Sequence, residues 1–233
     1  MQLFYVPNIS GVEVFLNEVE SKHAIKVLRL SNGDTMQLVD GKGGFYKAKV
    51  SDANPKKCQL IITNTQTDLG KKDFRLHIAI APTKNIDRFE WFLEKATEIG
   101  VDEITILLTE HSERKTVNKE RLEKILISAM KQSIKAYLPA LNEITHFNDL
   151  ISTTTCKNKF IAHCNDGEKN HLKNMIKKGE NALILIGPEG DFSIDEVKLA
   201  KEYGFQEISL GNSRLRTETA GVVACHIVNM ANE

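Results

Sequence analysis

The chain has 233 residues, of which 41% are hydrophobic and 27% charged, and 31 basic residues balance 31 acidic ones. This length allows one large domain or two modest ones, and the composition is typical of soluble globular proteins. A neutral total excludes a chain that is basic throughout. It does not exclude a local basic face, because nucleic-acid binding depends on the distribution of charge rather than its sum.

The cysteines and the N-terminus favour a cytoplasmic protein. Cys58, Cys156, Cys164 and Cys225 are scattered, and none forms a C-x-x-C pair, which argues against a zinc or redox motif. Free thiols suit a reducing cytoplasm. The opening MQLFYVPNIS lacks the features of a secretory signal, and no apolar run reaches the ~18 residues that span a membrane. We therefore expect a cytoplasmic location, no membrane contact and no metal site.

Residues 1–70 predict a small, mostly β domain. The stretch DTMQLVDGKGGFYKAKVSD contains two strand-like runs joined by a DGKGG turn, which predicts a hairpin. CQLIITNTQT predicts a further strand because it is rich in β-branched residues. Only VEVFLNEVESKHAIKVL has a helical pattern in this region.

Residues 71–233 alternate between predicted strands and predicted helices. The strands are RLHIAIAP, EITILLTE, KFIAHCN, NALILIG and EISLG. Helical spacing follows in DRFEWFLEKATEIG, KERLEKILISAMKQSIKAYLP, SIDEVKLAKEYG and TETAGVVACHIVNMA, and the long second helix has an apolar stripe from Leu122 to Ile134. This alternation predicts an α/β domain with a parallel sheet.

One predicted strand ends in an unusual turn, within LILIGPEGDFSIDE at residues 183–196. Ligands bind beyond the carboxyl ends of such strands, but this turn lacks the Gly-Lys-Ser/Thr of a phosphate loop. Glu189 and Asp191 would repel phosphate and suit a ligand with positive charge or hydroxyl and amine donors. Ser193 and Glu196 form a capping box, so a tight strand–helix connection is the alternative reading.

A second turn, LGNSRLRTETAG, contains two arginines before the last helix. Thr217 or Thr219 is placed to cap that helix. Arg216 stands just before the helix N-terminus, where a cation is disfavoured. Its pattern therefore predicts a negative partner, which is either Glu218 or a ligand.

These two turns resemble motifs of the RsmE-type 16S ribosomal RNA uridine-N3 methyltransferases. LIGPEGDFS is similar to their L-I-G-P-E-G-G-F/L-S/T segment, and LGNSRLRTETA to their L-G-x-x-I/V-L-R-x-E-T-A segment. HAIKVLRLSNGD, KATEIGV and ERLEKILISAMKQSIKAYLPAL resemble three further elements of the family in the same order. Five ordered matches across nearly the whole chain are specific, whereas any one alone is weak.

The resemblance implies a SPOUT-class enzyme that depends on S-adenosyl-L-methionine. Its expected fold is a PUA-like β-barrel over residues 1–70, which helps to hold RNA, and a SPOUT methyltransferase domain over residues 71–233 with a C-terminal trefoil knot. Its expected partners are 16S ribosomal RNA, within the small ribosomal subunit, and a second copy of the chain. Apolar residues of the last helix, such as Val222 and Val223, suit such a dimer interface.

The resemblance also implies which residues form the site. The residues expected to bind the cofactor are Leu185, Ile186, Gly187, Glu189, Gly190, Ile208, Leu210, Gly211, Leu215, Arg216, Thr219 and Ala220. Arg216 is expected to stabilise the developing uridine anion. Glu218 is expected to act as base or to orient Arg216, and Glu189 is an alternative base. His163 or Asn165 could reach the same pocket, although either could instead cap a strand end.

For RNA contacts, the expected residues are Arg29, Lys84, Lys95, Arg114, Lys131 and Gln132. For a single lysine, an ordinary solvated surface charge is the more common role. Two departures from the family bear on the site. Asp191 stands where a second glycine is usual, and aspartate tolerates positive φ better than most residues. TEHSERK differs from the usual loop, which makes the role of Arg114 less certain.

Three other functions remain open at this point. One is a SPOUT methyltransferase that acts on another nucleotide of ribosomal RNA or on transfer RNA, with different RNA contacts. Another is an RNA-binding protein that has lost the cofactor, against which the intact GPEG and LRTETA turns argue. The third is an unrelated α/β nucleotide enzyme, which the missing G-x-G-x-x-G and phosphate-loop signatures disfavour.

Overall fold

The computed structural model describes residues 3–233 and divides into two compact units. The first holds the described residues up to Lys71 together with Met130–Leu138, and the second holds Lys72–Ala129 and Pro139–Glu233. The segment Met130–Leu138 comes from the middle of the predicted α/β region. Its Ala136 carbonyl accepts a hydrogen bond from the Gly43 N–H at 2.9 Å, within the first unit.

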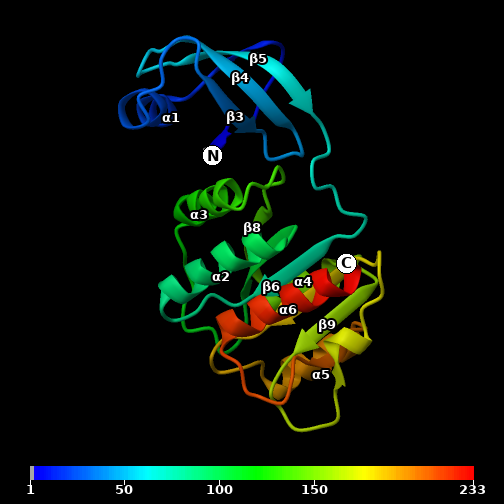
Figure 1. Ribbon diagram of the computed structural model, residues 1–233. Helices are drawn as coiled ribbons and strands as arrows, with labels where there is room; N and C mark the ends of the chain where they lie inside the picture. The colour runs from blue at the N-terminus through cyan, green and yellow to red at the C-terminus, as the bar shows by residue number, and fades with distance from the viewer. Residues whose placement is uncertain (1–2) are drawn as a thin grey trace. The chain divides into compact units, whose positions relative to one another are not determined.

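The first unit is a small curled sheet of five strands (Figure 1). The strand order is β1 (Leu3–Tyr5), β3 (Thr35–Val39), β4 (Phe45–Asp52), β5 (Gln59–Gln66) and β2 (Glu13–Phe15). The antiparallel pairing of β3 with β4 confirms the predicted hairpin. In its turn, Gly43 has φ +98°, and a Cβ there would come within 2.4 Å of the Tyr137 hydroxyl, so only glycine fits.

The helix predicted over VEVFLNEVESKHAIKVL is wrong at its start. Glu13–Phe15 is strand β2, because Val14 pairs with Leu60 of β5 and its β-branched side chain fits a pleated surface. Helix α1 (Glu18–Lys22) begins only after Asn17, whose side chain caps it by accepting from the Glu20 N–H. A π-helical turn η1 (His23–Val27) continues from α1.

The second unit is a seven-stranded sheet with all strands parallel, as predicted. The strand order is β10 (Asn170–His171), β12 (Gln206–Ser209), β9 (Asn158–Ala162), β11 (Ala182–Ile186), β6 (Leu76–Ile80), β7 (Glu103–Leu108) and β8 (Ala140–His146). The helices are α2 (Ile86–Ile99), α3 (Lys119–Gln132), α4 (Phe147–Thr153), α5 (Ile194–Glu202) and α6 (Thr217–Asn232), with a short 3-10 turn η2 (Leu172–Asn174). No helix within residues 3–233 is both long and apolar enough to cross a membrane.

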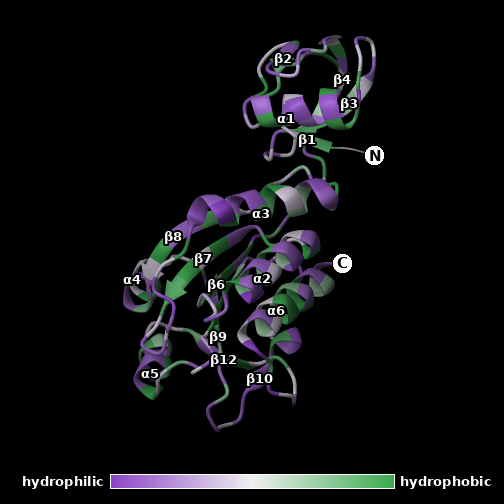
Figure 2. Cartoon of the chain, turned by 90° about the vertical axis from the view of Figure 1, so that its left-hand side faces the viewer, coloured by the Kyte–Doolittle hydropathy of each residue, from purple (hydrophilic) through white to green (hydrophobic). Residues whose placement is uncertain are grey.

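Helices cover both faces of this sheet, with α2 and α6 on one side and α4 and α5 on the other (Figure 2). On the α4 and α5 side, Leu183 and Leu185 of β11 pack with Phe147 and Phe192. On the opposite side, a Cβ on Gly221 of α6 would come within 2.6 Å of the Phe92 ring, so glycine allows α6 to lie close to α2. Side chains therefore alternate between two apolar layers along each central strand.

The prediction that the long helix has an apolar stripe from Leu122 to Ile134 is wrong at its end. Helix α3 stops at Gln132, and Ile134 has φ +55° with 52% of its surface exposed. The Lys135 N–H donates to the Met130 carbonyl, and the Ile134 N–H to the Lys131 carbonyl. These two bonds form a Schellman turn with Ile134 in the left-handed position, which ends the helix.

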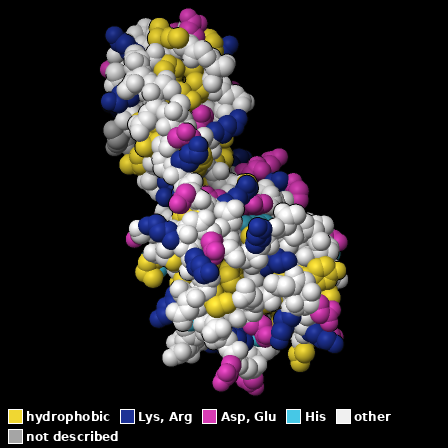
Figure 3. Space-filling model, turned by 90° about the vertical axis from the view of Figure 1, so that its right-hand side faces the viewer, with side chains coloured by type: hydrophobic (Ala, Val, Ile, Leu, Met, Phe, Trp, Pro, Cys, Tyr) yellow, Lys and Arg dark blue, Asp and Glu magenta, His cyan; other side chains and the backbone are white. Residues whose placement is uncertain are grey.

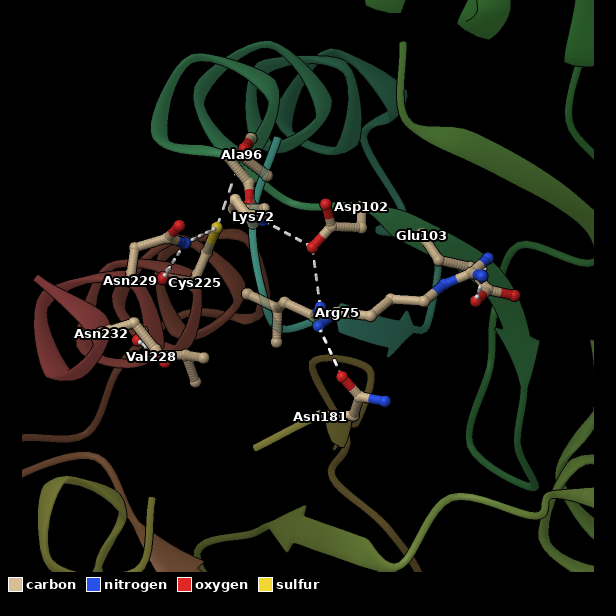
Figure 4. A network of polar contacts seen from close by, with 12 residues as sticks. Lys72, Arg75, Ala96, Asp102, Glu103, Asn181, Cys225, Val228, Asn229 and Asn232 are labelled. Atoms are coloured by element: carbon tan, nitrogen blue, oxygen red, sulfur yellow. Dashed lines mark hydrogen bonds and ion pairs between the residues drawn. The ribbon is translucent and has the colours of Figure 1, made fainter. Parts of the chain in front are cut away.

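A polar network joins the amino ends of β6, β7 and β11 (Figure 4). The Asp102 carboxylate accepts from the Lys72 ammonium at 2.5 Å and from the Leu76 N–H at 2.8 Å. The Arg75 N–H donates to the Asn181 side chain at 2.7 Å, and the Arg75 guanidinium pairs with Glu103 at 3.0 Å. These bonds fix the starts of three neighbouring strands relative to each other.

Candidate active site

The carboxyl ends of β12, β9 and β11 are neighbours in the sheet, and the loops that follow them enclose a cavity of about 620 Å³. The loop after β9 and the segment before α6 lie at the same end of the unit (Figure 1). Nine of the residues expected to bind a cofactor line the cavity: Ile186, Gly187, Glu189, Ile208, Leu210, Gly211, Leu215, Arg216 and Ala220. Residues that are more than thirty positions apart in the chain, such as Ile186 and Ala220, therefore line one site.

Three expected cofactor residues do not line the cavity. Leu185 is fully buried among the core residues on the α4 and α5 side, because side chains alternate along β11 and only Ile186 turns toward the cavity. Gly190 lies against the loop after β7, where a Cβ would come within 3.1 Å of the His111 Cβ. Thr219 lies within the first turn of α6, outside the lining.

The Gly-Pro-Glu-Gly turn is held on several sides by other loops. The Glu189 carboxylate accepts from the Lys84 N–H at 3.0 Å. Both halves of the predicted capping box between Ser193 and Glu196 are present at the start of α5. The His111 Nδ1 lies 3.1 Å from the Gly190 carbonyl, to which it donates because a carbonyl only accepts. The turn is therefore a rigid wall of the cavity.

Asp191 ties this turn to the loop after β9. Its φ is +62°, which confirms that the position requires a left-handed backbone. One carboxylate oxygen accepts from the Cys164 N–H at 2.7 Å, and the other accepts from the Phe192 N–H at 2.8 Å. A glycine would satisfy the backbone here, but it would not make the bond to Cys164.

His163, at the end of β9, is a buried part of the cavity wall. Its side chain is 1% exposed, and its Nε2 lies 3.1 Å from a carboxylate oxygen of Glu207. The other Glu207 oxygen pairs with Lys201 at 2.5 Å. Burial, and then the charge of Lys169, lower the pKa of His163. Its Nδ1 has no hydrogen-bond partner within residues 3–233.

Lys169 is a lining residue that sequence reasoning missed. Its ammonium donates to the carbonyl of His163 at 3.1 Å and also to the carbonyl of Asn165. Asn165 itself lies outside this lining, so of the two residues considered at the end of β9 only His163 reaches the cavity. A lysine in a polar loop carries no sequence signal that separates it from a solvated charge.

Arg216 is the N-cap residue of α6 and makes no side-chain cap. The expectation that Thr217 or Thr219 caps this helix is wrong, because both lie inside it. The Arg216 side chain is exposed at the cavity, and no residue within 3–233 pairs with it. Glu218 is only 7% exposed, lies outside the lining and has one oxygen without a partner. The alternative of an internal Arg216–Glu218 pair is therefore not realised.

Four of the six residues expected to contact RNA are engaged within the chain. Lys84 pairs with Glu113, Lys95 with Glu94 and Glu98, and Lys131 with Glu20. Arg114 donates to the carbonyls of Thr83 and Lys84, so it braces the loop after β6. Arg29 and Gln132 are exposed. On the face drawn in Figure 3, basic and acidic side chains are interspersed rather than gathered by sign.

The cavity combines apolar walls, exposed backbone and charges of both signs. Ile186, Ile208, Leu210 and Leu215 supply apolar surface, and Glu189 and Arg216 stand at the same opening. No group of three or more metal-binding side chains exists among the described residues. This donor set fits an uncharged ring flanked by polar and zwitterionic groups, and it does not resemble a phosphate site.

The chain is similar to known protein families over both of its units. It matches the RNA methyltransferase domain family over residues 70–229 and the RNA methyltransferase PUA domain over residues 16–63. It is 30% identical to ribosomal RNA small subunit methyltransferase E of Rickettsia conorii, over 87% of this chain and 83% of the relative.

Two solved structures have the same fold over the whole chain. A probable rRNA-methyltransferase from Porphyromonas gingivalis is 42% identical with a TM-score of 0.93, covering 100% of this chain and 98% of its own. Ribosomal RNA small subunit methyltransferase E of Neisseria gonorrhoeae, solved with bound S-adenosyl methionine, is 26% identical with a TM-score of 0.89. That match covers 100% of this chain and 98% of the other.

Proposed function

The chain belongs to the family of ribosomal RNA small subunit methyltransferase E, and from this premise we propose how its residues act. It is an S-adenosylmethionine-dependent enzyme that methylates N3 of a uridine in small-subunit (16S) ribosomal RNA. The observation that carries the residue assignments is the exposed side chain of Arg216, which pairs with no residue in the described part of the chain, at a cavity with mixed apolar and polar walls.

The residues at the cavity fit this cofactor. Ile186, Ile208, Leu210 and Leu215 would pack on the adenine, while backbone groups near Gly187 and Gly211 would meet its polar edge. Gly211 has φ +137°, which other residues rarely adopt, and its N–H and carbonyl are both bonded to the Ser209 hydroxyl at 3.1 Å, which fixes the shape of this turn. When bound, S-adenosylmethionine supplies an electrophilic methyl group on a sulfonium. The chain's own task is to orient the uridine and to manage the proton on N3.

Arg216 meets the main electrostatic requirement. N3 of uridine is an imide nitrogen, so loss of its proton leaves a negative charge that is shared with the neighbouring carbonyl oxygens. A guanidinium at the cavity stabilises this anion and lowers the cost of deprotonation. The target base must also leave the RNA stack to reach the cavity.

We assign Glu218 a supporting role rather than direct removal of the proton. Its carboxylate lies in the first turn of α6, where the helix dipole stabilises negative charge, and outside the cavity lining. Glu218 lies two residues after Arg216, so its negative charge offsets the positive charge of Arg216 before the helix. Glu189 lines the cavity, but its carboxylate already accepts from the Lys84 N–H at 3.0 Å, so we assign it the role of holding the turn in place.

Several wider features belong to the same proposal. We propose that the first unit is a PUA-like barrel that holds RNA, and that Arg29 and Gln132 contact it. β11 lies between β6 and β9 although it follows β9 in the chain, and β12 lies beyond β9, which supports the proposed trefoil knot. Half-exposed apolar residues of α6, including Met230, support a homodimer. The working location is the cytoplasm, where the enzyme meets small ribosomal subunits.

The experiment that tests this function uses purified protein, S-adenosylmethionine and small ribosomal subunits that lack base methylation. After digestion of the RNA, mass spectrometry quantifies N3-methyluridine for the wild type and for Arg216→Ala. We expect the product with the wild type and its near-complete loss with the variant. Equal product from both would contradict the role of Arg216. Absence of product with subunits and with bare RNA, despite cofactor binding, would favour another RNA substrate.

A further inference from the structure

The buried imidazole of His163 has a hydrogen-bonding capacity that the protein does not use. Its side chain is 1% exposed in the wall of the cavity, yet its Nδ1 has no partner within residues 3–233. Leaving a buried polar atom unpaired costs about 1–3 kcal/mol. Because His163 is one of the residues that line the cavity, this unpaired nitrogen is expected to meet a group of the ligand when the cavity is filled.

The contacts around His163 determine what that group must be. Glu207 is a carboxylate whose pKa is lowered, chiefly by its hydrogen bond with Lys201, so it is ionised and can only accept. The Nε2 of His163 must therefore carry the proton that is donated to Glu207, at 3.1 Å. In the neutral ring the Nδ1 is then a bare acceptor.

The ring is also held rigidly in place. The Lys169 ammonium donates to the His163 carbonyl at 3.1 Å, and the next residue, Cys164, donates its N–H to Asp191 at 2.7 Å. Together with Glu207, three separate segments therefore fix the backbone and ring of His163. A side chain fixed in this way before a ligand arrives is preorganised for binding.

Resting on the proposed function, we propose that the His163 Nδ1 accepts a hydrogen bond from an O–H or N–H group of the bound cofactor, and that Glu207 positions it by fixing its tautomer. The cofactor offers such donors on its ribose, its adenine amino group and its α-ammonium group. Each is a hydrogen-bond donor, and the same acceptor could serve any of them. The neutral ring of His163 can accept this hydrogen bond without gaining or losing a proton on binding.

The pH dependence of binding follows from the same geometry. The charged groups that face the ring are Glu207 from β12, Lys169 from the loop after β9 and Asp191 from the turn after β11, while Lys201 of α5 acts through Glu207. Burial lowers the pKa of His163 below the ordinary value, so the ring is neutral at neutral pH. Protonation at lower pH would place a proton on Nδ1 and oppose the donor of the ligand.

The test measures binding of S-adenosylhomocysteine, the demethylated cofactor, by calorimetry to the full chain and two matched variants. His163→Gln places an amide near the former Nε2 and can still donate to Glu207, but it has no acceptor at the Nδ1 position. His163→Asn places its amide near the former Nδ1 and loses the contact with Glu207. We expect affinity to fall about tenfold or more for His163→Gln, and less for His163→Asn.

Two further arms identify the donor and the titrating group. 5′-Methylthioadenosine lacks the amino-acid part, so a loss seen with both ligands assigns the donor to the ribose or adenine. A loss seen only with S-adenosylhomocysteine assigns it to the ammonium group. From about pH 8 to about pH 5 the wild type should lose affinity, while both His163 variants should not. The control His226→Gln removes an exposed histidine and should keep the wild-type slope.

The outcomes separate this inference from the proposed function. Equal affinity and equal pH slope of the wild type and His163→Gln, with similar thermal midpoints, would overturn the inference and leave the enzyme assignment standing. Failure of the wild type itself to bind S-adenosylhomocysteine would overturn both. If His163→Gln is unstable, the pH slope of the wild type and the affinity of His163→Asn still decide the matter.

Discussion

The two ends of the parallel sheet differ in how their polar groups are satisfied. At the amino end, Asp102 accepts from both Lys72 and the Leu76 N–H, and Asn181 accepts from the Arg75 N–H. At the carboxyl end, the Nδ1 of His163 and one oxygen of Glu218 are buried without a partner among the described residues. Satisfied groups stabilise a fold, whereas buried unpaired groups lower its stability.

This difference indicates where the chain has given up stability for function. The carboxyl end also holds Arg216 before a helix N-terminus and Asp191 in a left-handed conformation, both of which are locally unfavourable. Such local conflicts concentrate at binding sites. Substitutions at the two ends should therefore have opposite effects on stability and activity.

The largest expected effect is at Arg216. Arg216→Ala should lower the methylation rate about 100-fold or more, because it removes the charge that stabilises the uridine anion. It should also leave stability unchanged or raise it by about 0.3–1 kcal/mol, since a cation before the helix N-terminus is lost. Single-turnover kinetics and urea unfolding measure the two effects. The control Arg214→Ala removes a neighbouring arginine of the same loop. An equal loss of rate in this control would show that the effect depends on the total positive charge of the loop and not on Arg216 itself.

Asp102 should show the reverse pattern. Asp102→Ala leaves the Leu76 N–H without its acceptor and the Lys72 ammonium with the Gly100 carbonyl in place of an ion pair, and we expect it to cost about 2–3 kcal/mol of unfolding free energy. Activity per folded molecule should stay near that of the wild type. The control Glu123→Ala breaks an exposed pair with Lys119 and should cost about 0.5 kcal/mol or less. Chemical denaturation with a parallel activity assay tests this, and a loss of activity without a loss of stability would contradict it.

Glu218 should have a smaller effect on rate than Arg216. Glu218→Gln keeps the size of the side chain and removes its charge, so we expect the rate to fall by about tenfold rather than 100-fold. If Glu218 instead takes the proton itself, the pH dependence of the rate should lose its acidic limb in this variant. A rate–pH profile of the wild type and the variant distinguishes support of Arg216 from direct proton removal.

The parts of the fold that could be predicted are those set by local pattern. The β3–β4 hairpin and the capping box at Ser193 each depend on a few neighbouring residues. Strand β8 was missed because it is an edge strand whose residues are largely half-buried, so its sequence shows no clean apolar run. The unit boundaries also depend on Met130–Leu138, and its packing involves residues far away in the chain.

The site could be predicted only in part for the same reason. The glycine turns and Arg216, which line the cavity, were singled out because they follow predicted strands or precede the last helix, and because they lie in segments that resemble family motifs. The face toward which a strand residue points could not be predicted, which is why Leu185 was assigned to the cavity together with Ile186, although only Ile186 of these two lines it. The pairs His163–Glu207 and Cys164–Asp191 join residues that are 44 and 27 positions apart. No local pattern predicts such a pair, because only the strand order brings its members together.

The smallest expected effect separates the two roles of Asp191, its backbone conformation and its anchoring of the loop after β9. Asp191→Ala keeps a Cβ at φ +62° and loses both hydrogen bonds, so we expect it to cost about 1–2 kcal/mol of unfolding free energy. Asp191→Gly loses the same bonds without the steric cost, and it should lie within about 1 kcal/mol of the wild type.

Affinity for S-adenosylhomocysteine should not follow this difference in stability. Both variants release the Cys164 N–H and loosen the wall that carries His163, so both should bind the ligand a few-fold more weakly, by about the energy of one hydrogen bond. Asp191→Asn, which keeps an acceptor toward Cys164, should retain most of the affinity. If the affinities of the alanine and glycine variants instead follow their unfolding free energies, the carboxylate acts through the turn itself. In that case the loop after β9 is positioned without it.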